Sequence, residues 1–115
     1  MKKHQTYNDG VARFYTPIND AENGERPDMV LGNPFLSLRY QNRTVGLRRM
    51  AAIKELGQKV DNLIRVQASD AVRKVSTQTV CVTSDGARFD VKRLQDVTDA
   101  TPRSVDIYLE RTELP

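Results

Sequence analysis

The chain has 115 residues, a mass of 13.0 kDa and a formal net charge of +3, and 38% of its residues are hydrophobic. A chain of this length buries about two-thirds of the surface that its unfolded form exposes, which suits a single domain over residues 1–115 with one modest core. One cysteine and one histidine, with no tryptophan, exclude a disulfide framework and a multi-thiolate metal site and argue against histidine-based catalysis.

The hydropathy of the chain gives no sign of a membrane segment. No apolar run approaches the roughly 20 residues that cross a bilayer. Residues 1–5 include two lysines, but no apolar stretch follows them, which is not the pattern of a secretory signal. Residues 1–9 are polar, and we expect them to be flexible. We expect no membrane partner.

The positive charge is concentrated in the middle of the chain. Residues 35–93 hold twelve Lys and Arg against five Asp and Glu, a local charge of +7, whereas residues 94–115 hold two against five, a local charge of −3. This distribution favours either head-to-tail assembly through complementary patches or a basic surface that faces nucleic acid. A solvated surface without a partner is the third interpretation.

The first part of the chain predicts two short strands separated by a long loop. Residues 11–15 alternate loosely and predict a strand. Residues 19–34 contain two Pro and two Gly, so we expect a surface loop that is either a partner contact or an ordinary excursion. Residues 35–40 alternate and predict the second strand. One face of that strand carries Leu36, Leu38 and Tyr40.

Residues 43–59 predict a short helix or, alternatively, a mobile loop. Thr44 is a suitable N-cap and Gly57 a suitable C-terminal stop. The apolar stripe between them is narrow, because Ile53 and Leu56 lie away from the helical face that carries the other apolar side chains.

The clearest local pattern is a β-hairpin. Two β-rich runs, Val80–Thr83 and Arg88–Val91, flank Asp85-Gly86. Because glycine accepts the positive φ of a tight turn, this pattern predicts a hairpin that turns at these two residues. Before the hairpin, residues 63–66 predict a strand and residues 67–76 a connecting loop.

Residues 104–111 alternate strictly and predict the last strand. We expect Val105, Ile107 and Leu109 to face the core. The alternate residues, Asp106, Tyr108 and Glu110, should then face the solvent. Five or six short strands, one short helix and long loops predict a mainly β fold, in which the strands form a small antiparallel β-barrel or sandwich.

The residues that usually carry catalysis or bind metals are too few or badly placed. Cys81 lies between Val80 and Val82 in a predicted strand, where a free cysteine behaves as a small hydrophobe. Asp96 and Asp99 lack the surrounding acidic ladder of a calcium loop, and there is no glycine-rich phosphate loop. We therefore predict no catalytic, cofactor-binding or metal-binding residues, no cofactor, and no enzymatic activity.

Nucleic-acid binding is one function that the charge supports. Basic residues between Arg39 and Lys59 could line one face and contact phosphates. Base stacking on a barrel needs exposed aromatic side chains in the strands, and the candidates are Tyr40, Phe89 and Tyr108. One possible function is therefore that of a small β-barrel that binds single-stranded nucleic acid.

Two stretches resemble a known family when their order and spacing are taken together. The first is Thr44-Val45-Gly46 followed by a basic pair, and it leads to residues 61–66. The second is the hairpin over residues 85–94 with the closing strand 106–111. Phe89 and Val91 stand where the family pattern often has Tyr and Ile, and both are conservative in a strand.

With residues 7–12, which look like the start of family members from phages of Gram-positive bacteria, this similarity spans about residues 7–111. The family is that of the small head-tail joining proteins of tailed bacteriophages, also called head-closure or stopper proteins. It has no catalytic residues to transfer.

The resemblance implies a β-barrel subunit that forms a homo-oligomeric ring in the neck of the virion. Such a ring would connect the portal-side adaptor protein of the DNA-filled head to the tail completion or tail-tube protein, and would help close the channel until genome ejection. It would touch double-stranded DNA non-specifically. The subunits would be in the host cytoplasm during assembly.

Charge and position select the candidate site residues. The candidates for facing DNA in the channel are Arg43, Arg48, Arg49, Lys54 and Lys59. The candidates for the interface between subunits are Asp20, Glu22, Glu25, Arg73, Lys74, Asp106 and Glu110.

Overall fold

The computed structural model describes residues 4–19, 29–30, 32–44, 51 and 60–112. Its strands, in chain order, are β1 (Gly10–Tyr15), β2 (Ile18–Asn19), β3 (Met29–Val30), β4 (Leu36–Arg43), β5 (Asn62–Gln67), β6 (Val80–Thr83), β7 (Arg88–Val97) and β8 (Ser104–Arg111). One 3-10 helix, η1 (Ala71–Lys74), lies between β5 and β6.

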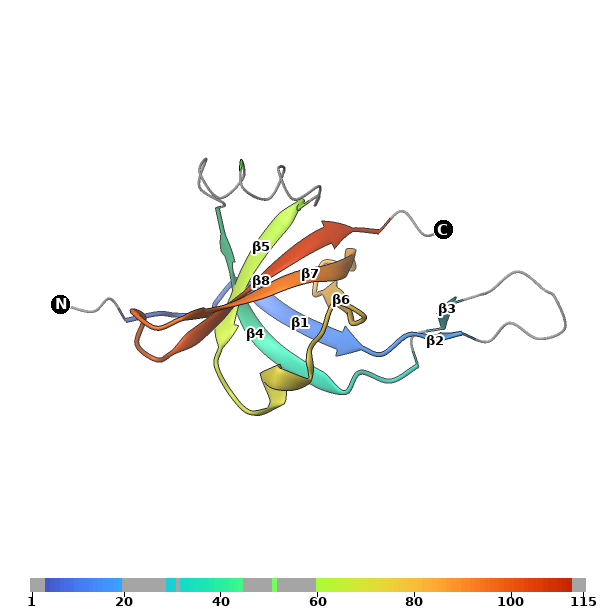
Figure 1. Cartoon of the computed structure of the whole chain (residues 1–115), viewed down its shortest axis with the longest axis horizontal. Helices are drawn as coiled ribbons and strands as arrows, with labels where there is room; N and C mark the ends of the chain where they lie inside the picture. Colours follow the sequence, from blue (N-terminus) through green and yellow to red (C-terminus); the bar gives the residue numbers. More distant parts are fainter. Residues whose placement is uncertain (1–3, 20–28, 31, 45–50, 52–59, 113–115) are drawn as a thin grey trace, which may run out of the picture.

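Six of these strands form a closed antiparallel barrel in the order β1-β4-β5-β8-β7-β6, with β6 pairing back to β1 (Figure 1). The mainly β fold predicted from the sequence is thereby confirmed, in its barrel form. Closure pairs every barrel strand on both sides, so the barrel has no open edge. The remaining two strands, β2 and β3, form a separate two-stranded ribbon that lies beyond the barrel (Figure 1).

The predicted strands correspond to barrel strands, and two of them are clearly longer than predicted. The strand predicted over residues 35–40 is β4 and continues to Arg43. The run predicted over residues 88–91 continues to Val97, because a register shift between Val91 and Arg93 lets β7 stay paired with β8 along its whole length. A β-bulge of this kind adds local twist and helps a sheet to curve. The bulge therefore gives β7 the curvature that barrel closure needs.

Two predicted segments have a different outcome. Residues 67–76, expected to be a plain loop, contain η1, whose Val72 is buried in the core. Within residues 19–34, expected to be one long loop, Asn19 pairs with Met29 in the β2–β3 ribbon. The helix or loop predicted over residues 43–59 lies mostly outside the described residues.

The core fills the barrel interior, and every second side chain along a strand points into it. The predicted alternation is confirmed on β8, where Val105, Ile107 and Leu109 belong to the main core cluster. On β4, Tyr40 is buried, and Leu36 and Leu38 pack against the same cluster. The aliphatic composition of the chain is thus concentrated on one face of each strand, as a barrel requires.

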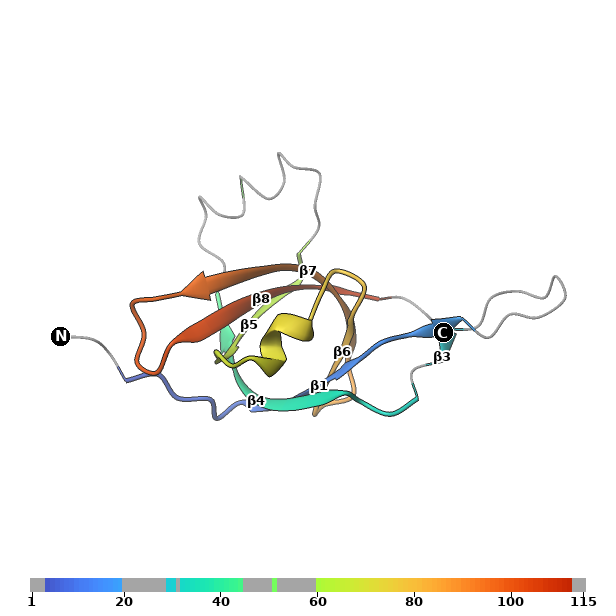
Figure 2. The ribbon, with the colours of Figure 1, turned by 60° about the horizontal axis from the view of Figure 1, so that its bottom comes forward.

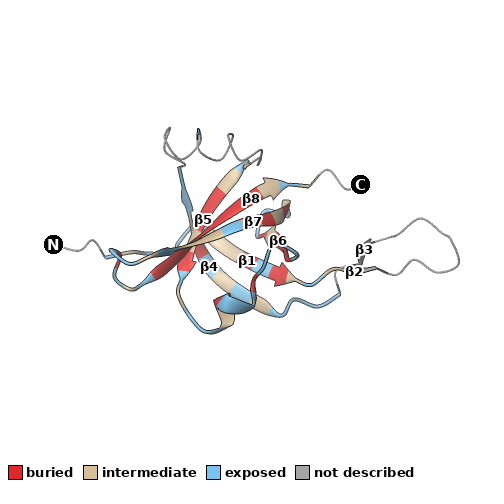
Figure 3. Cartoon of the chain, viewed as in Figure 1, coloured by how far each residue is buried: buried red, intermediate tan, exposed pale blue. Residues whose placement is uncertain are grey.

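The prediction that the other face of β8 meets solvent is wrong at two positions. Asp106 is 0% exposed and Tyr108 2% exposed, and β8 is buried over most of its length (Figure 3). Both side chains alternate with the core residues, so they do lie outside the barrel wall. Their burial means that other parts of the chain cover this wall.

The turn at Asp85-Gly86 is confirmed. Gly86 has a φ of 87° and its N–H donates to the carbonyl oxygen of Thr83 over 2.9 Å. The Asp85 carboxylate accepts hydrogen bonds from the Thr83 hydroxyl and the Ala87 N–H. Both hydrogen bonds lower the pKa of Asp85, and the bond from Thr83 has the larger effect. They do so because they favour the charged form of the carboxylate.

Cys81 is completely buried between inward-facing aromatic residues, since it lies opposite Phe14 on β1 and Phe89 on β7. Burial raises the pKa of its thiol to about 12. Because the thiolate is the reactive species, we expect the native protein to leave Ellman's reagent unreacted from pH 8 to about pH 10. In urea the thiol should react at once. Immediate stoichiometric reaction of the native chain would contradict this placement.

Candidate functional site

The outer wall of the barrel carries a row of polar side chains that crosses four strands. Arg65 on β5 is paired in register with Gln41 on β4 and with Asp106 on β8, and Asp106 is paired with Gln95 on β7. Residues opposite each other in neighbouring strands project to the same side of the sheet. The row is therefore continuous from β4 to β7.

The centre of this row is a buried ion pair between Arg65 and Asp106. The Arg65 Nε donates to Asp106 Oδ1 over 2.7 Å and Nη2 donates to Oδ2 over 3.1 Å. The Arg65 side chain is 12% exposed. The hydrogen bonds to Asp106 raise the pKa of Arg65, although burial acts in the opposite direction. Two parallel bonds of this kind hold both planar groups in one orientation.

A polar segment, residues 4–9, crosses over this pair, and we call it the N-terminal strap. At one end the Gln5 N–H donates to the carbonyl oxygen of Thr101 over 2.8 Å. At the other end Asp9 Oδ2 accepts from the Asn42 N–H over 2.7 Å. These residues, expected from the sequence to be flexible, are thus hydrogen-bonded on both sides of the ion pair.

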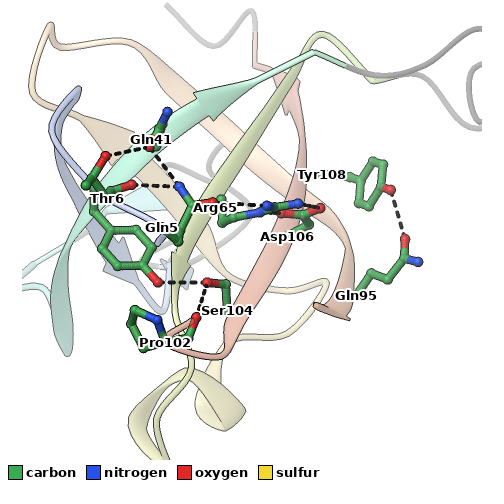
Figure 4. Close-up of polar contacts among 10 residues, drawn as sticks. Gln5, Thr6, Gln41, Arg65, Gln95, Pro102, Ser104, Asp106 and Tyr108 are labelled. Atoms are coloured by element: carbon green, nitrogen blue, oxygen red, sulfur yellow. Dashed lines mark hydrogen bonds and ion pairs between the residues drawn. The ribbon is translucent and has the colours of Figure 1, made fainter. Parts of the chain in front are cut away.

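Gln5 connects the strap to the polar row (Figure 4). Its Oε1 accepts from Arg65 Nη1 over 3.1 Å, and its Nε2 donates to Gln41 Oε1 over 2.8 Å. One side chain therefore satisfies a third Arg65 donor and at the same time binds β4. The strap explains why Asp106 is covered although it projects away from the core.

Two tyrosines make further hydrogen bonds on the same outer wall. The Ser104 hydroxyl donates to the Pro102 carbonyl over 3.1 Å, so the Tyr7 hydroxyl, 2.7 Å away, is the donor to Ser104. The Tyr108 hydroxyl donates to Gln95 Oε1 over 2.9 Å (Figure 4). This arrangement contains no nucleophile next to a base. Its hydrogen bonds hold the N-terminal strap against the barrel.

The structure describes one of the residues predicted to face DNA. Arg43 is exposed at the end of β4. The other four candidates, Arg48, Arg49, Lys54 and Lys59, lie outside the described residues. Two further exposed arginines, Arg13 and Arg39, lie on the outer faces of β1 and β4.

The predicted interface residues are found in different settings. Arg73 and Lys74 are exposed on η1. Glu110 is half-buried and paired with Lys92 over 3.1 Å. Asp106 does not lie where the interface prediction needs it. Its carboxylate is buried within its own chain and bound to Arg65, so it is not available to a neighbour. The candidates Asp20, Glu22 and Glu25 lie outside the described residues.

The aromatic side chains considered for base stacking are buried. Tyr40 and Phe89 belong to the barrel core, and Tyr108 packs with Leu63 on the outer wall. A base can stack only on a ring with an accessible face. None of these three rings offers such a face in the described structure.

The helix η1 crosses one end of the barrel (Figure 2). A pocket of about 620 Å³ is lined in part by this helix. We call it the η1 pocket. Its apolar lining includes Val72, Val75, Leu94 and Val105, and charged side chains stand at its rim. No sequence pattern predicts this pocket, because its lining comes from three separate segments. The only local signal was the apolar spacing of Val72 and Val75 within an expected loop.

Other kinds of site find no support in the part of the chain that the structure describes. There, no group of three or more His, Cys, Asp or Glu side chains could hold a metal ion. No helix among the described residues is long and apolar enough to span a membrane. No protein-family model matches the chain, and no curated protein is significantly similar to it in sequence.

The buried ion pair leads to a test with a built-in control. Removing one partner of a buried pair typically lowers the free energy of unfolding by about 3–5 kcal/mol, because the other charge stays buried and unpaired. We expect this from Asp106→Ala in urea denaturation. Glu110→Ala breaks a partly exposed pair on the same strand and should change the free energy by about 1 kcal/mol at most.

A double variant separates the pair from the rest of the wall. Arg65→Met with Asp106→Leu leaves no unpaired charge, so its stability should exceed that of Asp106→Ala. If Asp106→Ala and Glu110→Ala lower the free energy of unfolding equally, the Arg65–Asp106 pair contributes no more to stability than a partly exposed pair does.

Proposed function

We propose that this chain is a structural protein of the bacteriophage neck. In this proposal it forms a ring that joins the portal and adaptor of the DNA-filled head to the tail, and that helps close the channel until ejection. The proposal is supported by the order of the motifs over residues 7–111 and by the closed β-barrel, the architecture that the family resemblance implies. Its partners would be the portal-side adaptor and the tail completion or tail-tube protein.

The observation that carries the proposal is the β2–β3 ribbon. Its two strands pair with each other and belong to a sheet separate from the barrel. A lone two-stranded ribbon is marginally stable at best in water, so a ribbon of this kind is suited to packing against another surface. In a ring of subunits each ribbon has a neighbour to pack on.

The charge of the chain supports a mild contact with double-stranded DNA. Phosphate contacts need only basic side chains and carry no sequence information. We assign this role to Arg43 and, from the sequence, to Arg48, Arg49, Lys54 and Lys59. The protein would act in the virion neck without a cofactor and without enzymatic activity.

Single-stranded nucleic-acid binding is the alternative function. The burial of Tyr40, Phe89 and Tyr108 removes the three aromatic side chains that were candidates for stacking, and stacking is a main source of affinity in such barrels. Among the described residues, Phe35 is the one exposed large hydrophobic ring, and a single ring is a poor platform for successive bases. Binding through arginines alone would be weak and strongly dependent on salt. We therefore favour the neck protein.

The position of the chain in the particle tests the proposal. In the phage that encodes it, electron microscopy of purified virions labelled on this protein should place the label at the neck, between head and tail. Particles made without the protein should have filled heads that lack tails or lose their DNA. Absence of the chain from mature virions would overturn the proposal. Tight, salt-sensitive binding of the free protein to single-stranded oligonucleotides would favour the alternative.

Reversal of the candidate DNA-facing charges tests their role. We expect Arg43→Glu with Arg48→Glu and Arg49→Glu to leave the thermal unfolding temperature unchanged, while DNA retention or ejection is impaired. Arg13→Glu, which reverses an exposed charge on β1, serves as the matched control and should have little effect. Normal infectivity of the triple variant would remove the channel assignment.

A further inference from the structure

The N-terminal strap, residues 4–9, is attached to the barrel mainly through polar contacts. None of its residues is buried, and none belongs to either hydrophobic cluster. The barrel ladder begins only after the strap, with Gly10 opposite Tyr40. Segments with few buried apolar contacts open locally at a small fraction of the free energy of global unfolding. The strap can therefore leave the barrel without removing anything from its core.

The ion pair beneath the strap stays paired when the strap is lifted. Arg65 and Asp106 hold each other through two hydrogen bonds, and these bonds lie within the barrel wall, between β5 and β8. In the open state water replaces Gln5 at the third Arg65 donor, and no charge is left without its partner. The large penalty for removing one partner of a buried pair therefore does not oppose opening.

The strap is closed by one side chain whose hydrogen bonds are all directed. The guanidinium of Arg65 only donates, so the atom that faces it at 3.1 Å has to be the oxygen of the Gln5 carboxamide. The nitrogen of that carboxamide then donates to Gln41 Oε1 over 2.8 Å and to the Thr6 carbonyl over 2.7 Å (Figure 4). The orientation of Gln5 in turn fixes that of Gln41.

Arg65 and Gln41 together form a site for a primary carboxamide, which we call the carboxamide socket. It offers a donor on β5 and an acceptor on β4, and a primary carboxamide is the neutral group that satisfies both. An aliphatic side chain of the same length would leave both unpaired beneath the strap. Sites that are built to hydrogen-bond a group reject analogues that lack it. The socket therefore selects Gln5 by its chemistry as well as by its position.

Gly10 lies where the strap joins β1, and only glycine fits there. Its φ is 153°, a value that other residues rarely adopt. A Cβ at this position would meet the hydroxyl of Ser84 and, at 3.1 Å, the ring of Tyr40. Because glycine accepts the widest range of backbone angles, the direction of the strap can change here while β1 keeps its pairing. Gly10 is thus a suitable hinge.

We propose that the strap is a releasable arm. It opens as one unit about Gly10 while the barrel stays folded, and Gln5 in the carboxamide socket is the contact that keeps it closed. Opening frees the arm and uncovers the polar wall around Arg65 at the same time. The inference concerns a change of shape within one chain, so it does not depend on the neck function.

Hydrogen exchange of the full chain, followed by NMR, measures the opening. The Gln5 N–H, which donates to Thr101, and the Asp9 N–H, which donates to Tyr40, report on the two ends of the strap. The amides of the β5–β8 ladder report on the barrel. We expect the two strap amides to share one protection factor, at least about a hundredfold below that of the ladder.

Two variants remove the two halves of the closing contact. Gln5→Met keeps the length of the side chain without its hydrogen bonds, and Gln41→Met removes the acceptor of the socket. Each should lower the protection of the Asp9 N–H at least about tenfold. The double variant should lower it little further than Gln5→Met does, because both changes break the same contact.

The matched control is Asn8→Ala, at an exposed position of the strap. It should change the protection of the strap amides by about twofold at most. In every variant the β5–β8 ladder should remain at least about a hundredfold better protected than the strap, because the barrel stays folded when the strap opens.

Four results would overturn the inference. Strap amides as well protected as the ladder would mean that the strap opens only when the barrel unfolds, and strap amides without protection would mean that the socket holds nothing. If Gln5→Met loosens the Gln5 N–H but not the Asp9 N–H, the strap is not one unit. If Asn8→Ala loosens the strap as much as Gln5→Met does, the socket has no special part in closing it.

Discussion

The fold depends on the position of one charged side chain, the carboxylate of Asp106. In β8 every second side chain enters the barrel core, so a shift of one residue in its pairing would place Asp106 among apolar side chains and put Ile107 outside. Burying an ionised carboxylate without a partner is far less favourable than burying an aliphatic group. Arg65, directly opposite on β5, removes that penalty in one register only. The pair is therefore a register lock for the β5–β8 wall.

That lock also determines what the N-terminus does. Two charged groups on the outside of a barrel would normally stay in water, but here the strap covers them and Gln5 takes up a further donor of Arg65. The strap is held mainly through hydrogen bonds, and each contributes about 1 kcal/mol because water competes for the same groups. Several such hydrogen bonds, including those to Thr101 and Asn42, keep this polar segment in place. An apolar segment would need a hydrophobic groove to be held in the same way.

The sequence predicts well what depends on near neighbours in the chain and poorly what depends on distant ones. The alternation of Val105, Ile107 and Leu109 and the turn at Gly86 are local, and both are confirmed. The alternation of apolar and polar residues predicts only the side of the sheet on which Asp106 lies. Whether that side is covered depends on Gln5, about a hundred residues away in the chain, whose segment is polar and carries no hydrophobic period. The η1 pocket was missed for the same reason, since three separate segments line it.

The structure also changes how charge can contribute to assembly. The acidic end of the chain suggested a patch that could meet a basic neighbour, yet Asp106 is bound to Arg65 and Glu110 to Lys92 within the chain. These carboxylates have little left to offer a partner. The exposed acids that remain in the described part of this region, Asp96 and Asp99, lie at the β7–β8 end, and Asp96 lines the η1 pocket. Closure leaves no barrel edge for strand addition, so the barrel itself offers no free strand for pairing with another chain.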